Sequence, residues 1–172
     1  MRVSSPQLVA VCGLPGAGKS TVSSHVVDLV EGTRLRTDVV RKELFEVPTY
    51  TDDERDRVYD ELFARAEHRL ASGETVVLDA TFAERERRHA ARDVADTCGV
   101  AFRLIHVVCD PAVTEHRIAT RDDVSDADVD VYRQFRREFD SLTLEHHLVD
   151  NSGSLAETRS RVAALFEQVT VE

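Results

Sequence analysis

Cysteine is scarce in this sequence, and no long apolar segment is present. The three cysteines, Cys12, Cys98 and Cys109, are odd in number and follow no metal or redox spacing, which argues against a disulfide framework and against a zinc site. No apolar segment approaches the roughly 20 residues that span a bilayer, and residues 1–6 lead to a strand-like segment without a signal-peptide core. We therefore expect a cytoplasmic protein with no membrane partner.

Lysine and asparagine are almost absent. Of the 22 Lys and Arg residues only Lys19 and Lys42 are lysines, and Asn151 is the single asparagine. A GTPase reads its base with an Asn-Lys-x-Asp motif, so the sequence excludes that class. The 32 acidic residues give a net charge of −10, which weighs against nonspecific binding to nucleic acid but not against a local basic channel.

Low-complexity segments, internal repeats and flexible linkers are also missing from the chain. With 42% hydrophobic and 31% charged residues, the composition is that of a globular protein. A chain of 172 residues is long enough for one domain with a buried core. We therefore expect a single domain over residues 1–172.

Strand-like and helix-like segments alternate along the chain. Short apolar segments predict strands at residues 7–12, 33–37, 74–80, 101–109 and 146–149. Helical spacing of apolar residues predicts helices at residues 19–30, 39–46, 51–72, 81–99, 110–121, 125–139 and from 154 onward. This alternation argues for an α/β fold, a three-layer sandwich around a mostly parallel five-stranded sheet.

Capping signals mark the starts of these helices. A Ser or Thr followed three residues later by Glu or Asp occurs at Thr51/Glu54, Thr81/Glu84, Ser125/Asp128 and Ser154/Glu157. Asp110 is predicted to cap another helix, with Pro111 at its first position. In the helix after Ser125, we expect Val131, Phe135 and Phe139 to be buried.

A complete phosphate-binding motif joins the first strand to the first helix. It reads G-x-x-x-x-G-K-S, and the predicted nucleotide site comprises Gly13, Leu14, Pro15, Gly16, Ala17, Gly18, Lys19, Ser20 and the following Thr21. Glycines let successive backbone amides turn inward around an anion, and the helix N-terminus adds partial positive charge. We expect Lys19 to reach the β- and γ-phosphates of ATP, and Ser20 to give its hydroxyl to Mg²⁺.

A P-loop by itself does not separate kinases from other nucleotide-binding proteins. A ring-forming ATPase normally carries an added helical domain, for which 172 residues leave no room. A transporter ATPase needs a signature loop that the sequence does not contain. Elimination therefore favours a small kinase.

Two carboxylates at predicted strand ends are candidates for the chemistry, because such ends open onto the crevice of an α/β sheet. Asp38 and Arg41 form a D-x-x-R pattern, in which Asp38 is placed to accept the proton of an attacking hydroxyl and Arg41 to orient the acceptor. A helix N-cap and a solvated arginine fit this spacing equally well. Asp79 is the predicted second ligand of Mg²⁺ and the second candidate for the base, with a helix N-cap as the other interpretation.

Four segments, GLPGAGKS, LRTDVVRKELF, VVLDATF and SDADVDVY, resemble the small AAA-type P-loop kinase family. That family is similar to polynucleotide 5′-kinases, zeta toxins, gluconate kinases and adenylylsulfate kinases, and the resemblance extends from Val9 to about Leu165. It implies a P-loop NTPase fold of the kinase type. It also implies that Asp38 is the catalytic base and Arg41 a substrate-binding arginine.

The resemblance further implies a lid and a base-binding loop. Arg117 and Arg121 share one helix face where similar kinases place a lid arginine that stabilises the transition state, although ion pairs on a solvated face also explain them. Residues 150–155 lie where related kinases hold adenine, and they also read as an ordinary strand–turn–cap. A stripe after Asp79 is expected to be a solvated, salt-bridged face rather than an acceptor site, and it consists of Arg85, Arg88 and Arg92.

These observations predict a Mg²⁺-dependent kinase that transfers the γ-phosphoryl group of ATP to a hydroxyl acceptor, most simply a small molecule. The predicted catalytic residues are Lys19, Asp38, Arg41, Arg117 and Arg121. One alternative is a polynucleotide or tRNA kinase, which residues 46–57 disfavour because they carry more acid than base. The other is a nucleotide-binding regulatory ATPase without an acceptor, in which Asp38 is dispensable.

Overall fold

The computed structural model describes residues 5–120 and 126–167. Its strands are β1 (Gln7–Cys12), β2 (Thr33–Arg36), β3 (Val76–Asp79), β4 (Ala101–Val108) and β5 (His147–Asp150). Its helices are α1 (Lys19–Val30), α2 (Thr37–Leu44), α3 (Asp52–Ala71), α4 (Arg85–Cys98), α5 (Pro111–Ala119), α6 (Asp126–Glu138) and α7 (Leu155–Phe166). The order of strands and helices agrees with the order predicted from the sequence.

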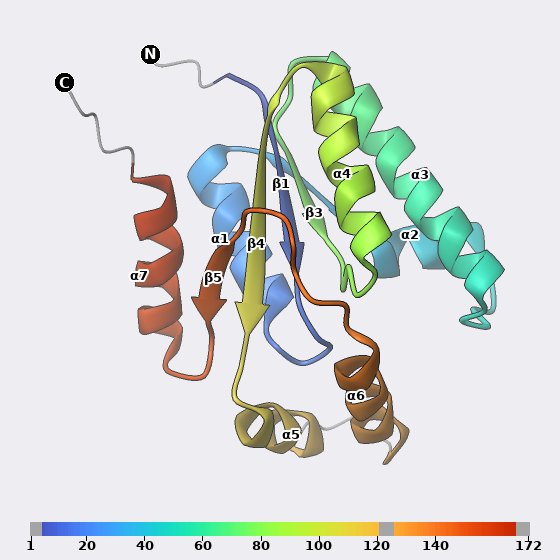
Figure 1. The fold of residues 1–172 in the computed structure, drawn as a ribbon, viewed down its shortest axis with the longest axis vertical. Coiled ribbons are helices and arrows are strands. Elements are labelled where there is room, and N and C mark those ends of the chain that lie inside the picture. The colour runs from blue at the N-terminus through green and yellow to red at the C-terminus, as the bar shows by residue number, and fades with distance from the viewer. Residues whose placement is uncertain (1–4, 121–125, 168–172) are drawn as a thin grey trace.

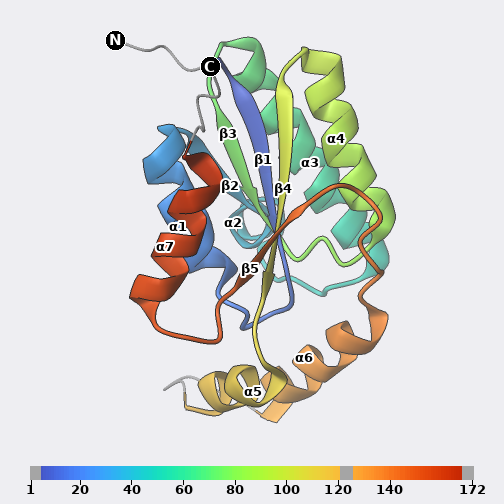
Figure 2. The same ribbon diagram turned by 60° about the vertical axis from the view of Figure 1, so that its left-hand side comes forward.

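The strands form one sheet in the order β2-β3-β1-β4-β5, and every neighbouring pair is parallel. Helices α1 and α7 cover one face of this sheet, and α3 and α4 cover the other (Figure 1). Helices α5 and α6 lie beyond the carboxyl ends of the strands, as Figure 2 also shows. The predicted three-layer α/β sandwich is therefore confirmed. Because the sheet is parallel, the carboxyl ends of its strands all lie at the same edge.

Burial on both faces of the sheet follows from alternation along the strands. In β1, Leu8, Ala10 and Cys12 pack with the cluster under α3 and α4. The intervening Val9 and Val11 pack with the cluster under α1 and α7. All five side chains are fully buried, which explains why this strand reads as a continuous apolar segment. Among the described residues, no helix is both long enough and apolar enough to cross a bilayer.

The predicted helix start at Thr81 is wrong, because α4 begins at Arg85 and Glu84 is its N-cap. A carboxylate from a distant segment replaces the expected local cap: Asp140 Oδ2 accepts a hydrogen bond of 2.9 Å from the Arg85 amide. The chain before α4 instead makes a turn in which Phe82 has a left-handed φ of 47°. Its buried ring and the 3.1 Å bond from its amide to the Tyr59 hydroxyl hold this costly conformation.

Other helix and strand boundaries differ from the predicted ones by a few residues. Thr37 belongs to α2 rather than to the preceding strand, and α5 ends at Ala119. In α6 the buried face contains Tyr132, which is 1% exposed, whereas Val131 is 43% exposed and its predicted burial is wrong. The predicted caps at Thr51 and Ser154 are confirmed by side-chain bonds to amides three residues later. The helix start predicted at Ser125 lies outside the described residues.

Candidate active site

The loop between β1 and α1 is held tightly against two other segments. A Cβ at Gly13 would lie 2.5 Å from the Val107 carbonyl oxygen, and one at Gly18 would lie 2.0 Å from Asn151 Nδ2. Gly18 also has a φ of 96°, which side-chain-bearing residues rarely adopt. Because Gly18 is the N-cap of α1 and has no side chain, the first amides of the helix are left for an anion.

The polar side chains of this loop lie at the start of α1. Lys19 folds back over the loop, and its Nζ donates a 3.0 Å hydrogen bond to the Leu14 carbonyl. Ser20 is exposed, and its Oγ accepts a 3.4 Å bond from Arg36. Both positions agree with the expected roles on phosphate and Mg²⁺, which stay predictions.

Asp79 ends β3 beside the phosphate-binding loop. Its carboxylate is 6% exposed, and Oδ2 accepts a 2.7 Å bond from the Ser23 hydroxyl in α1. Arg36 Nε lies 3.9 Å from the same oxygen. The described residues contain no group of three or more His, Cys, Asp or Glu that could hold a metal ion. The Asp79 carboxylate and the Ser20 hydroxyl nevertheless fit Mg²⁺, since both already lie near one cationic side chain, that of Arg36. Mg²⁺ prefers oxygen ligands and retains water and phosphate oxygens in its remaining positions.

Asp38 lies in the first turn of α2 and is not its N-cap, since that position is Arg36. Its side chain is 54% exposed, and Oδ2 forms a 2.9 Å ion pair with Arg36. Its Oδ1 accepts a 2.9 Å bond from the Val39 amide. The carboxylate is therefore oriented by two donors and remains accessible to an acceptor.

Arg41 lies one turn further along α2 and has a fixed partner. Its Nε is 3.1 Å from Glu54 Oε1, and its guanidinium lies 5.0 Å from the centre of the Tyr50 ring. Glu54 is 3% exposed and also accepts bonds from the Thr49 amide and hydroxyl. Burial alone would raise the pKa of Glu54, but the bonds from Thr49 and the nearby Arg41 lower it. Glu54 therefore stays ionised and holds the Arg41 side chain.

Arg36 is the residue of this site that the sequence did not reveal. It approaches Ser20, Asp38 and Asp79, which belong to three different elements. The pairing of β2 with β3 places Arg36 directly beside Asp79. Its position at the end of a predicted strand could have indicated a role in the site. That position becomes informative only when the neighbouring strand, β3, is known.

Arg117 contacts the loop between β5 and α7. It donates a 2.9 Å bond to the Asn151 carbonyl and a 3.5 Å bond to the Gly153 carbonyl. Asn151 in turn donates a 2.8 Å bond to the Ala17 carbonyl, and its Oδ1 accepts one of 2.6 Å from Thr158. The loop at 150–155 is thus connected to the phosphate-binding loop, while Arg121 lies outside the described residues.

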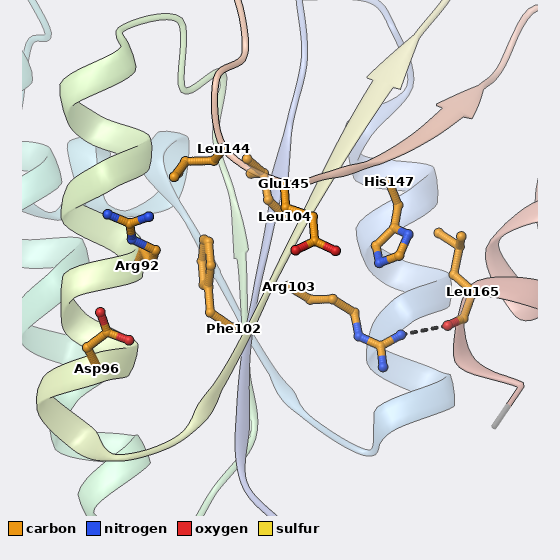
Figure 3. A pocket seen from close by; sticks show the side chains of 9 residues that line it. All are labelled: Arg92, Asp96, Phe102, Arg103, Leu104, Leu144, Glu145, His147 and Leu165. Atoms are coloured by element: carbon orange, nitrogen blue, oxygen red, sulfur yellow. Dashed lines mark hydrogen bonds between the residues drawn. The ribbon is translucent and has the colours of Figure 1, made fainter. Parts of the chain in front are cut away.

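The arginine stripe on α4 does not behave as one surface. Arg88 is 1% exposed, against the expectation of a solvated face, because it donates to the carbonyls of Ala83 and Asp140. Burial lowers the pKa of its guanidinium. Arg92 lines a cavity of about 490 Å³ between α4, β4 and α7, where Arg103 donates to the Leu165 carbonyl (Figure 3). This cavity lies along the first half of β4, away from the strand ends at which the phosphate-binding loop sits.

A smaller cavity of about 290 Å³ adjoins the phosphate-binding loop at Leu14. Side chains of β4, α5 and α6 line the rest of it, among them His106, Tyr132 and Arg136. His106 stacks on Phe139 with ring centres 5.4 Å apart. Burial, with added repulsion from His146 and Arg88, lowers the pKa of His106 to about 4, so the His106 ring is uncharged at neutral pH.

Comparison with known proteins gives a family and a fold. A family model described as an AAA domain matches residues 8–142. An uncharacterized protein of Mycobacterium tuberculosis is 33% identical over 101 residues, which are 52% of this chain and 20% of that protein. The chain therefore spans about a fifth of the length of the curated relatives that it matches.

Two solved structures share this architecture over nearly their whole length. The APS kinase of Mycobacterium tuberculosis, in complex with AMPPNP and APS, is 20% identical with a TM-score of 0.74, covering 95% of this chain and 99% of that one. A gluconokinase from Sinorhizobium meliloti is 22% identical with a TM-score of 0.69, covering 94% of each chain. At these identities the likeness establishes a common fold.

Proposed function

The chain belongs to the AAA domain family, and from its site we propose that it is a kinase that transfers the γ-phosphoryl group of ATP to a hydroxyl group of a small molecule. The observation that carries this proposal is the meeting of Ser20, Asp38 and Asp79 around one guanidinium, at the strand ends beside the phosphate-binding loop. Kinases of the same fold support the reaction class.

In the proposed reaction the acceptor hydroxyl oxygen attacks the γ-phosphorus, and the bond from that phosphorus to the β–γ bridging oxygen breaks. The hydroxyl proton passes to the Asp38 carboxylate, and ADP leaves. Lys19 and the amides at the start of α1 bind the phosphates. Mg²⁺, when bound through Ser20 and Asp79, would neutralise charge on the phosphate oxygens.

The remaining arginines have proposed roles near this centre. Arg41 is oriented by Glu54 through Nε, and we propose that its other N–H groups contact the acceptor. Arg117 is engaged with the carbonyls of the loop at 150–155, which supports a role in shaping the base site. Arg121 therefore stays the predicted lid arginine from the sequence, with Arg117 as the alternative.

A small acceptor is favoured over a nucleic acid end. Residues 46–57, which follow the helix that carries the proposed acceptor contact Arg41, contain more acidic than basic residues. A net charge of −10 opposes a polyanion. We therefore expect transfer to be nearly independent of salt concentration.

The test is transfer of ³²P from γ-labelled ATP into pooled metabolites and, separately, 5′-hydroxyl oligonucleotides. Asp38→Ala should abolish labelling of the acceptor while leaving ATP affinity within a few-fold, because Asp38 acts on the acceptor rather than on the nucleotide. Asp52→Ala is the matched control, since this carboxylate is 96% exposed at the start of α3. Label in oligonucleotides would instead indicate a nucleic acid kinase. Free phosphate released equally by the native protein and by Asp38→Ala would indicate a regulatory ATPase.

A further inference from the structure

We propose that Arg36 is a positioning residue that holds the Asp38 carboxylate until a divalent cation binds at Asp79 and Ser20. Arg36 and the cation then compete for the same oxygens, so that arrival of the metal–nucleotide complex releases Asp38 to the acceptor. The inference rests on the proposed function for its meaning, but the competition itself concerns cation binding and requires no acceptor.

One guanidinium reaches three oxygen-bearing groups of the site. Its Nη2 lies 2.9 Å from Asp38 Oδ2 and 3.4 Å from Ser20 Oγ. Its Nε lies 3.9 Å from Asp79 Oδ2. The side chain of Arg36 is 31% exposed, so it has solvent into which it can move. The guanidinium therefore bridges the predicted base and the predicted metal ligands.

This bridge is built from fixed elements rather than from mobile surface chains. Arg36 ends β2 and pairs in register with Asp79 at the end of β3. Helix α2 begins at the next residue, which turns Asp38 back toward the strand end. The Ser23 hydroxyl fixes Asp79 from α1. Strand register and helix start together determine that Arg36 lies between the two carboxylates.

The charges explain why a divalent cation would displace Arg36. A cation bound to Asp79 and Ser20 would lie within a few ångströms of the guanidinium, where two like charges repel. Asp79 is 6% exposed, so this repulsion is screened by water less than it would be at the surface. Once Arg36 moves away, Asp38 keeps the bond from the Val39 amide and gains a free oxygen for the hydroxyl proton. Cation and nucleotide are thus bound before the acceptor is engaged productively.

The experiment is titration of Mn²⁺ into the ADP complex, followed by electron paramagnetic resonance of the free ion, without acceptor. Arg36→Gln should tighten Mn²⁺ binding by about five- to tenfold, because one positive charge about 4 Å from the site is removed. Arg34→Gln is the matched control: it lies on the same strand and contacts the Ser20 carbonyl and Ser23, but neither carboxylate. We expect this control to change the affinity less than twofold.

A double-mutant cycle tests the bridge to Asp38. Asp38→Asn should tighten Mn²⁺ binding in the native protein, because the cation then no longer has to break the ion pair between Arg36 and Asp38. In the Arg36→Gln background, where no such pair exists, the same change should not tighten Mn²⁺ binding. Equal effects in both backgrounds, an unchanged or weaker Mn²⁺ affinity in Arg36→Gln, or an equal gain in Arg34→Gln would overturn the proposal. Thermal unfolding checks that each variant is folded, and a failure to find an acceptor leaves these equilibria unaffected.

Discussion

Close contacts at single residues shape the phosphate-binding loop. Gly18 faces Asn151, and Asn151 joins the loop at Ala17 to the chain after β5. A buried amide that donates on one side and accepts on the other tolerates little displacement, since either bond left unmade costs free energy. The loop is therefore positioned by contacts from β4 and from the segment after β5, not by its glycines alone.

Gly18→Ala tests this contact. A methyl group would lie 2.0 Å from Asn151 Nδ2 at a φ of 96°, so we expect the loop to shift and ATP affinity to fall by at least about tenfold. Gly73→Ala is the matched control, because Gly73 has a φ of 85° but a Cβ added there would meet no atom within 4 Å. It should lower stability by about 1 kcal/mol and leave ATP affinity unchanged. Calorimetric titration with ATP distinguishes the two, and a Gly18→Ala protein with native affinity would contradict the account.

At the scale of secondary structure, the residues that follow α6 are bound to α4 and to the turn before it. The end of α6 joins the turn before α4 through the bond of 2.8 Å from the Asp140 amide to the Ala83 carbonyl. Arg88 adds a 2.7 Å bond to the Asp140 carbonyl, and its guanidinium lies over the Phe139 ring. Helix α6, which lines the cavity beside Leu14, is thereby anchored to α4.

Asp140→Ala should remove the side-chain cap of α4 and lower the free energy of unfolding by about 1 kcal/mol. Asp140→Ser keeps an oxygen that can accept from the Arg85 amide, and it should recover most of the loss. Urea denaturation measures both variants. Equal destabilisation by alanine and serine would show that the carboxylate does not act as a cap.

The sequence predicted the order of the strands and helices because apolar periodicity and local caps are short-range properties. The phosphate-binding loop, β1 and α1 were predicted at the residues where they occur. The membership in an AAA family is confirmed, as is the α/β sandwich. The start of α4 was wrong because its cap comes from Asp140, which is distant in the sequence.

The composition of the site was less predictable for the same reason. Asp38 and Asp79 were recognisable as carboxylates at strand ends, but their common neighbour Arg36 depends on the pairing of β2 with β3. Likewise the partner of Arg41 is Glu54, which the sequence marked as a helix cap. Its amide does bind Thr51, yet its carboxylate turns to Thr49 and Arg41. Roles that depend on long-range contacts require the fold.

The stability of the whole molecule should depend on pH through His106. Its pKa is lowered to about 4 in the folded protein, whereas the unfolded chain has the ordinary value of 6.5. The unfolded state therefore binds more protons below pH 6.5, and stability present above that pH is lost as the pH falls toward 4. We expect a loss of about 1 kcal/mol between pH 7 and pH 5, because the side chain is partly exposed and water screens part of the effect.

His106→Gln should remove this part of the pH dependence. The control is His68→Gln, since His68 is exposed on α3 and should leave the dependence unchanged. Unfolding free energies from urea denaturation at pH 7 and pH 5 measure the difference. The same slope in the native protein and in His106→Gln would contradict the assignment to His106.

The strand order also has a consequence for the time course of synthesis. β1 is translated before both of its neighbours in the sheet, which are β3 and β4. Its side chains, which are fully buried in the folded protein, therefore stay uncovered until residues 76–79 and 101–108 have been made. Such long-range pairing is slow and leaves apolar surface exposed in the meantime. Gly13 packs on Val107 and Gly18 on Asn151, so the phosphate-binding loop completes its contacts later still. The predicted nucleotide site thus gains its supporting contacts only after β4 and the segment that follows β5 have been made, long after its own residues.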